Sequence, residues 1–543
     1  RISKCDRSMK RWLLLSLLVT YAANAQVSQR DLLLGKRSDE RLWWNLQRYE
    51  LEVNIHPESK AIEGSNKIFF EVLKPNQTTL QIDLQSPMVL DSVIDVKGIK
   101  LSFTKNELAH YVTLDSGLKV GEQTAITAYF SGIPKEAENA PWDGGVVWTE
   151  DSNGDPFIAT ANQGIGSSIW WPNKDHSYDE PENGAQITLI VPEGLTAVSN
   201  GRLTAQKVDN AKSYWTWEVK SPINNYAISF NVANYVSFGE TYKGENGALD
   251  LTYYVLPENL EAAKKQFQQT PKMLEAFEYW MGPYPFYQDG FKLVEVPYLG
   301  MEHQSAVTYG NGYENGYRGT DLSGTGHGLT FDFIIIHEAG HEWFANSITA
   351  DDKADLWIQE GFTAYSESLY LDYHQSKQSG VEYVIGTRKR IQNKQPMVGP
   401  REVNYDTPGD IYYKGANILN MLRTIVDDDT QWRSLLRSIS AHFYHQVISS
   451  RTLEQYIAQE LDLNLESFFE QYLRTAQLPR LVFQRAGNRL RFRFEESIEN
   501  FQMPVKIYLN GHSKWITPTT EWQSIRYTAA ENPIVDENFL LRL

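Results

Sequence analysis

The segment His337-Glu338-Ala339-Gly340-His341, taken with Glu360, constrains the fold of this chain more than any other feature. Residues four apart lie on one face of a helix, so a helix here would direct both imidazoles toward one point. Glu360 follows after eighteen intervening residues, within a second predicted helical stretch from Asp355 to Tyr370. The fold must therefore bring these two helices together.

Two histidines and one carboxylate are the protein ligands of many catalytic zinc sites, in which the fourth tetrahedral position stays open. Glu338 lies between the histidines, where it can act as general base on an attacking water. The alternative is a chance match on an amphipathic helix. The apolar run from Phe331 to Ile336 predicts a buried helix start and favours the metal site. We expect one zinc ion per chain with three ligands: His337, His341 and Glu360.

A second motif, Leu299-Gly300-Met301-Glu302-His303, lies upstream. Together the two segments resemble the aminopeptidase N-type zinc metallopeptidases, the gluzincin aminopeptidases that include leukotriene hydrolase. In that family a G-x-M-E-N motif precedes H-E-x-x-H…E, and its glutamate holds the free amine of the substrate. The resemblance implies that Glu302 binds this amine and that Gly300 and Met301 line the substrate edge. Leu299 and His303 depart from the pattern, and the sequence does not give the effect of His303. The alternative for Glu302 is an ordinary exposed acid on a strand.

The resemblance extends to the segment Ile411-Tyr412-Tyr413-Lys414-Gly415-Ala416, which is similar to the family's Y-x-K-G-a motif. The family tyrosine donates a hydrogen bond to the oxyanion, and the match falls on Tyr412. Tyr413 is a competitor, because the chain contains 30 tyrosines and a chance aromatic is common.

Two further positions match the family less closely. The segment Thr160-Ala161-Asn162-Gln163 resembles a T-Q-x-Q element whose second glutamine helps to bind the amine end, which makes Gln163 the candidate. Glu367, seven residues after Glu360, matches a family acid that could hold a zinc ligand. A solvated helix acid is the alternative for Glu367.

The order of patterns predicts a multidomain α+β fold. Residues 44–237 alternate polar and apolar positions between turn-rich breaks, which indicates an N-terminal antiparallel β domain. Residues 238–477 change to helical spacing after a few strands, and the resemblance implies a thermolysin-like α/β catalytic domain there. Residues 478–543 return to alternation around Asn510-Gly511, a hairpin signal, and predict a small C-terminal β-sandwich. The resemblance also implies a short form that lacks the C-terminal helical domain of larger relatives.

Residues 1–25 are expected to form a signal peptide with a few upstream residues. Met9-Lys10-Arg11 begins a basic region, an apolar run from Trp12 to Val19 follows, and Ala23-Asn24-Ala25 offers a cleavage site. The apolar run is shorter than the roughly 20 residues that span a bilayer. The one cysteine of the chain, Cys5, lies in this segment, so the mature protein would have no disulfide. We expect an exported protein, periplasmic or secreted, with no membrane span in the mature chain.

The formal net charge of −17 argues against nucleic acid as a partner, and no basic cluster opposes that. The partners expected are peptide substrates. The resemblance implies a zinc-dependent aminopeptidase that removes the N-terminal residue of peptides by attack of an activated water. Two alternatives remain: a zinc endopeptidase without a working amine anchor, and a catalytically inactive peptide-binding module. The preferred N-terminal residue and the oligomeric state are not given by the sequence.

Overall fold

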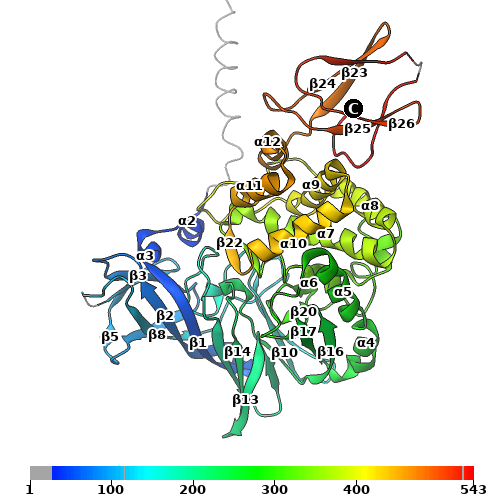
Figure 1. The fold of residues 1–543 in the computed structure, drawn as a ribbon. Helices are drawn as coiled ribbons and strands as arrows, with labels where there is room; N and C mark the ends of the chain where they lie inside the picture. The colour runs from blue at the N-terminus through cyan, green and yellow to red at the C-terminus, as the bar shows by residue number, and fades with distance from the viewer. Residues whose placement is uncertain (1–26, 115–116, 529–530) are drawn as a thin grey trace, which may run out of the picture.

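The computed structural model describes residues 27–114, 117–528 and 531–543. The predicted signal peptide lies outside these residues. Within them, no helix combines the length and the apolar character needed to cross a membrane. Figure 1 shows a β-rich N-terminal part in blue and cyan, a helical part in green and yellow, and a small β module in orange and red.

The N-terminal part is built on an eight-stranded sheet. Its order is β13-β14-β11-β1-β2-β8-β4-β5, with bounds Arg202–Asp209, Lys212–Val219, Ala185–Pro192, Trp44–His56, Ala61–Val72, Gln123–Gly132, Val89–Asp95 and Lys100–Leu101. Along β1, buried and half-buried side chains alternate over most of its length, as the sequence pattern predicts for a strand with one face on the core. The short helices α2 (Gln29–Gly35) and α3 (Asp39–Leu42) precede this sheet.

Two smaller sheets complete this part. One has the order β12-β15-β10-β9, with bounds Thr196–Val198, Asn231–Ala233, Pro156–Ala161 and Gly145–Glu150. The other has the order β3-β7-β6, with bounds Thr79–Asp83, Ala109–Thr113 and Phe103–Asn106. All three sheets contribute to one apolar core, which includes fully buried tryptophans such as Trp170 and Trp171.

The expectation of a wholly antiparallel N-terminal domain is wrong at one pair of strands. β1 and β11 are parallel, with Tyr49 opposite Ala185 and Asn54 opposite Ile190. Parallel strands need a long connection, and here residues 57–184 provide it by forming most of the other strands before the chain returns. The remaining pairs of these three sheets are antiparallel.

The part predicted to be catalytic begins with a five-stranded sheet and continues as helices. The sheet has the order β16-β17-β18-β20-β19, with bounds Val236–Gly244, Gly247–Val255, Phe291–Glu295, Val307–Tyr309 and Gly300–Met301. The helices are α4 (Leu260–Gln266), α5 (Gln269–Met281), α6 (Phe333–Gly340), α7 (Trp357–His374), α8 (Lys377–Gly386), α9 (Asp410–Val426), α10 (Asp429–His442), α11 (Ser450–Leu461) and α12 (Glu466–Arg474). A parallel pair, β21 (Ile348–Ala350) and β22 (Gln446–Ile448), joins distant parts of the helical region.

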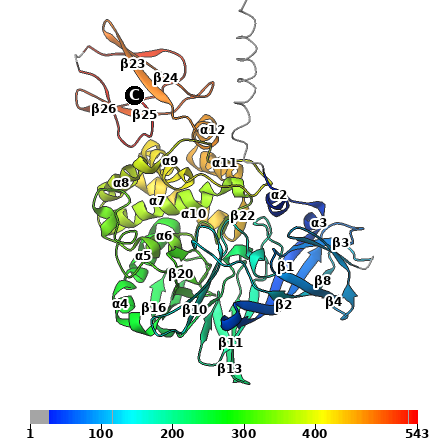
Figure 2. The ribbon, with the colours of Figure 1, turned by 180° about the vertical axis from the view of Figure 1, so that it is seen from behind.

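The C-terminal module contains two three-stranded sheets. Their orders are β23-β24-β27 and β26-β25-β28, with bounds Arg480–Ala486, Arg489–Glu495, Gln523–Arg526, His512–Ile516, Val505–Leu509 and Ile534–Val535. Asn510 and Gly511 form the predicted two-residue hairpin, and both have positive φ. Figures 1 and 2 both show this module beside the helices α9 and α12, on the side away from the N-terminal sheets. The predicted multidomain α+β class is confirmed.

Candidate active site

Helix α6 positions His337 and His341. Asp332 caps its N-terminus by accepting hydrogen bonds from the backbone N–H groups of Ile334 and Ile335 at 3.1 and 3.4 Å. The helix ends at Gly340, but His341 still has helical backbone angles of −64° and −18°. The two imidazoles therefore lie on one side of the helix end, with ring centroids 5.0 Å apart.

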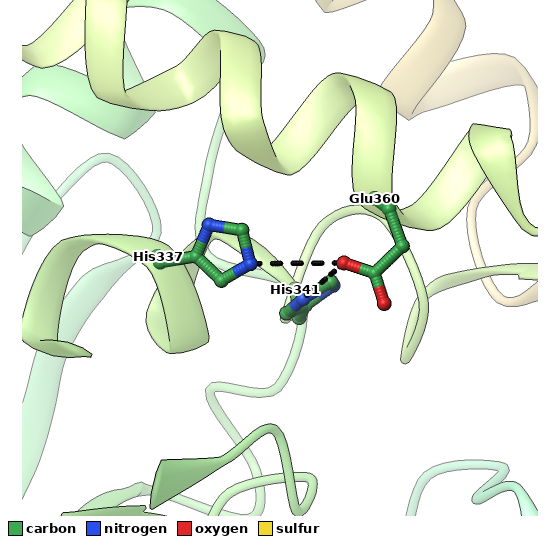
Figure 3. Close-up of side chains that lie close together, drawn as sticks. All are labelled: His337, His341 and Glu360. Atoms are coloured by element: carbon green, nitrogen blue, oxygen red, sulfur yellow. Dashed lines mark ion pairs between the residues drawn. The ribbon is translucent and has the colours of Figure 1, made fainter. Parts of the chain in front are cut away.

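Helix α7 brings Glu360 to the same place. Glu360 Oε2 lies 3.6 Å from His337 Nε2 and 3.3 Å from His341 Nε2. In Figure 3 the carboxylate descends from its helix toward both rings, and the dashed lines mark these two contacts. The close packing of α7 on α9 and α6 makes this meeting possible, because Gly361 and Gly415 allow the α7 and α9 backbones to approach.

The other ring nitrogens are held by acceptors. His337 Nδ1 lies 2.7 Å from Glu367 Oε1, and the Tyr383 hydroxyl donates to Glu367 Oε2 at 2.6 Å. His341 Nδ1 lies 3.0 Å from the Phe344 carbonyl oxygen. Carboxylates and carbonyl oxygens can only accept, so both Nδ1 atoms carry the proton and both Nε2 atoms are left for a ligand.

The buried charges of this cluster fit a cation. Glu360 Oε2 is buried and accepts no hydrogen bond from the described part of the chain. Burial would raise the pKa of Glu360, but the charges of the histidines hold it far below its usual range. Burial would likewise lower the pKa of His341, but Glu360 and Glu302 raise it to about 9. Two imidazole nitrogens and one carboxylate oxygen around one point are a suitable donor set for zinc.

Glu338 lies next to this cluster. Its carboxylate belongs to a second close group with Glu302 and His341, whose ligand atoms all lie within 4.8 Å of one another. Burial raises the pKa of Glu338 to about 7 and the charge of Glu302 adds to this rise, while His337 acts in the opposite direction. A carboxyl group with such a pKa suits both proton acceptance and proton donation near neutral pH.

Glu302 and Gln163 meet although 139 positions separate them in the sequence. Gln163 Nε2 donates to Glu302 Oε1 at 2.6 Å and to Glu360 Oε1 at 3.1 Å. The Tyr226 hydroxyl donates to Glu302 Oε1 at 3.2 Å, and burial is the main reason why the pKa of Glu302 is raised. The alternative of an exposed acid on a strand is wrong, because Glu302 is 2% exposed.

Gly300 and Met301 form the short strand β19, and both line the cleft. A side chain at position 300 would place its Cβ 2.7 Å from Ile334 Cγ2, so the glycine lets β19 approach helix α6. His303 is fully buried, does not line the cleft, and neither ring nitrogen has a partner among the described residues. Burial lowers the pKa of His303 to about 3, so this imidazole is neutral.

Tyr412 and Tyr413 both line the cleft, but their surroundings differ. The Tyr412 ring stacks near His337, with centroids 5.9 Å apart, and burial followed by the Glu360 carboxylate raises the pKa of Tyr412 well above its usual value. The Tyr413 ring instead lies 5.9 Å from the Arg390 guanidinium. This arrangement favours Tyr412 as the hydroxyl nearest the ligand cluster.

The cleft is a cavity of about 510 Å³ between the N-terminal and catalytic parts. Trp142 stands at its edge and is 58% exposed. The sequence patterns did not point to Trp142 or Lys353 in the cleft, nor to Tyr226, which supports Glu302 from the adjoining cavity. None of these three residues lies in a motif whose spacing indicates a catalytic or binding role.

Comparison with known proteins places this geometry in a family. The Peptidase M1 N-terminal domain matches residues 45–227, and the Peptidase family M1 domain matches residues 265–472. The glutamyl aminopeptidase of Rattus norvegicus is 27% identical over 297 residues, which cover 51% of this chain and 30% of that protein. The leucyl aminopeptidase of Saccharolobus solfataricus is 21% identical over 357 residues, covering 62% of this chain and 44% of that protein. The chain thus spans less than half the length of these relatives.

Solved structures show the same fold. The M1 zinc metallopeptidase of Deinococcus radiodurans superposes with a TM-score of 0.66 at 20% identity, covering 80% of this chain and 94% of that one. A mutant of the same protein, bound to a Tyr-Ser-Ala substrate, gives a TM-score of 0.65. The two M1 domain models match this chain one after the other, and the second match contains His337, His341 and Glu360. The chain therefore belongs to peptidase family M1, the aminopeptidase N-type metallopeptidases.

Proposed function

We propose that this protein is a zinc-dependent aminopeptidase that hydrolyses the N-terminal residue from peptides. One observation carries the proposal: the Glu302 carboxylate, held by Gln163 and Tyr226, lies within 4.8 Å of ligand atoms of Glu338 and His341. A peptide ammonium bound at Glu302 would thus hold the first peptide bond at the reacting groups. Relatives named as aminopeptidases support the proposal.

Each residue then has a defined task. When bound by His337, His341 and Glu360, a zinc ion supplies Lewis acidity to the peptide carbonyl and the attacking water. Glu338 accepts a proton from this water as the new C–O bond forms. It delivers the proton to the nitrogen of the leaving amine as the C–N bond breaks. The Tyr412 hydroxyl donates a hydrogen bond to the carbonyl oxygen as negative charge develops there, a contribution typically of about 3 kcal/mol.

One zinc ion per chain is part of this proposal. The two candidate ligand groups in the described residues share His341, so they cannot hold two ions independently. Metal analysis of the dialysed protein should give about one zinc per chain. Full activity in a sample with no transition metal would contradict the proposal.

The decisive assay compares alanyl-4-nitroanilide with N-acetyl-alanyl-4-nitroanilide. An enzyme that anchors the free amine on Glu302 should cleave the first and leave the second nearly untouched. An endopeptidase should show no such requirement for a free amine on longer peptides. An inactive peptide-binding module should cleave neither, whereas the proposed enzyme should lose turnover with a zinc chelator.

We also propose that the protein is exported, on the sequence of residues 1–25 alone. Expression with and without this segment, followed by fractionation and N-terminal sequencing, tests it. The expected mature N-terminus is Gln26. Retention of the full-length protein in the cytoplasm with Met9 or an earlier residue at its N-terminus would contradict export.

A further inference from the structure

Lys353 is a cation in the cleft that the proposed mechanism does not use. It begins the 3-10 turn Lys353–Asp355, which leads into α7 and therefore into Glu360. Among the described residues that line the cleft, it is the one lysine or arginine. It also lines an adjoining cavity of about 130 Å³.

The Lys353 ammonium has a neutral partner. Its Nζ donates to Asn404 Oδ1 at 2.8 Å, and across the described parts of the chain no carboxylate oxygen lies within 4.0 Å of it. The three acids closest to Lys353 in sequence are engaged elsewhere: Asp351 with Arg37 and Arg401, Asp355 with Arg401, and Asp352 with the backbone N–H groups of Ala354 and Glu402. Asp406 and Asp31 act on the ammonium without forming an ion pair with it among the described residues. The positive charge is therefore available to a ligand.

The surroundings hold this ammonium in place. Asn404 Nδ2 donates to Asp31 Oδ1 at 3.1 Å, and the Asn404 backbone N–H donates to the Asp31 carbonyl oxygen at 3.0 Å. Burial lowers the pKa of Lys353 to about 8, although the charges of Asp406 and Asp31 act in the opposite direction. A half-buried ammonium with no ion-pair partner is costly, and a ligand carboxylate would offset that cost.

The position of Lys353 indicates which part of a peptide it meets. Gln163, Gly164 and Leu356 line both cavities together with Lys353. Gln163 also donates to Glu302, the proposed amine anchor. Lys353 therefore lies on the wall of the cleft that also carries Gln163, whose amide bonds both Glu302 and Glu360. We infer that a peptide whose amine lies at Glu302 directs its first side chain toward this wall, because Gln163 joins the amine anchor to the part of the cleft that Lys353 lines.

We propose that Lys353 is a specificity-determining residue that binds a carboxylate of the peptide substrate. Its place beside Gln163 favours the side-chain carboxylate of an N-terminal glutamate or aspartate. The C-terminal carboxylate of a very short peptide offers the same chemistry. This inference rests on the proposed aminopeptidase function and adds a substrate class to it.

The first arm of the test uses glutamyl-, glutaminyl- and alanyl-4-nitroanilide, which carry no C-terminal carboxylate. The zinc-containing wild type should prefer glutamyl over its isosteric glutaminyl analogue by about tenfold in kcat/KM, the size expected for one partly desolvated ion pair. Lys353→Met should reduce this ratio to near one and leave alanyl hydrolysis largely unchanged. The matched control is Lys377→Met, which removes an exposed lysine paired with Asp429 and should keep the wild-type ratio.

The second arm compares trialanine with trialanine amide. If the C-terminal carboxylate is the ligand, the wild type should cleave trialanine faster than trialanine amide, and Lys353→Met should lose that preference. The glutamyl-to-glutaminyl ratio of the wild type should then stay near one. Lys353→Glu reverses the charge at this position, so this variant should cleave arginyl-4-nitroanilide faster than glutamyl-4-nitroanilide. Asp406→Asn removes an exposed acid from the cleft and should raise the preference for carboxylates.

Ratios of two substrates on one preparation do not depend on the fraction of folded protein. Lys353→Gln keeps a donor for Asn404 and replaces Lys353→Met if that variant does not fold. The role of Lys353 is overturned if the wild type gives ratios near one in both arms, or if the preferences persist in Lys353→Met. Alanyl hydrolysis would still support the proposed aminopeptidase in either case. Absence of alanyl hydrolysis by the wild type overturns both.

Discussion

Replacement of Glu367 should weaken zinc binding although Glu367 is not a ligand. Its Oε1 lies 2.7 Å from His337 Nδ1, its Oε2 accepts from the Tyr383 hydroxyl at 2.6 Å, and its side chain is 1% exposed. The charge of Glu367 makes the opposite nitrogen, Nε2, a better ligand and fixes the plane of the ring. Both effects disappear when the carboxylate is removed.

The magnitude follows from these contacts. Glu367→Gln keeps an oxygen that can accept from Nδ1 but loses the charge, and charge-assisted hydrogen bonds are roughly twice as strong as neutral ones. A loss of about 1.4 kcal/mol, or about tenfold in zinc affinity, is expected. Glu367→Ala also frees the His337 ring and leaves Tyr383 without its acceptor, so a loss of up to about a hundredfold is expected.

The assay is a competition titration of the metal-free protein against a chelating zinc indicator at fixed pH. The control is Glu454→Gln, because Glu454 is also buried and accepts from Arg474 at 2.7 Å, on helices outside the cleft. That variant should lose thermal stability and keep the wild-type Kd for zinc. Equal Kd values for wild type and Glu367→Ala, or equal weakening by the control, would refute the reasoning.

Three further substitutions test the site and its scaffold. Glu338→Gln should retain zinc and lose about 10² or more in kcat, because the amide cannot accept a proton; near wild-type kcat at normal zinc content would remove Glu338 from the mechanism. Glu302→Ala should lower both kcat and affinity for free peptides and leave the slow cleavage of acetylated peptides unchanged; equal slowing of both would exclude an amine anchor. Gly415→Ala would place a Cβ 2.7 Å from Gly361 Cα between α9 and α7, so the free energy of unfolding should fall by about 1–3 kcal/mol, and an unchanged urea midpoint would contradict this packing.

The local patterns of the chain predicted its elements well. Helix α6 begins after Asp332 as its apolar run predicts, and the hairpin turns at Asn510-Gly511. These features depend on contacts between residues close in sequence, such as an N-cap or a two-residue turn. The parallel pairing of β1 with β11 was not predicted, because it depends on the path of the intervening chain rather than on either strand.

Some residues of the candidate site could likewise be predicted from the sequence, whereas others could be found only in the structure. The sequence by itself predicted His337, His341 and Glu360 as a ligand set, because helical spacing places two imidazoles on one face and only certain residue types can coordinate zinc. The structure brings the ligand atoms of these three side chains within 4.8 Å of one another. Only the tertiary structure decided that Tyr226 supports Glu302, that the His303 ring is buried away from the cleft, and that Lys353 faces the cleft without an ion pair to any described residue. These residues come from segments far apart in the chain, and their meeting is set by the packing of the N-terminal sheets against the catalytic helices. No local spacing rule contains that information.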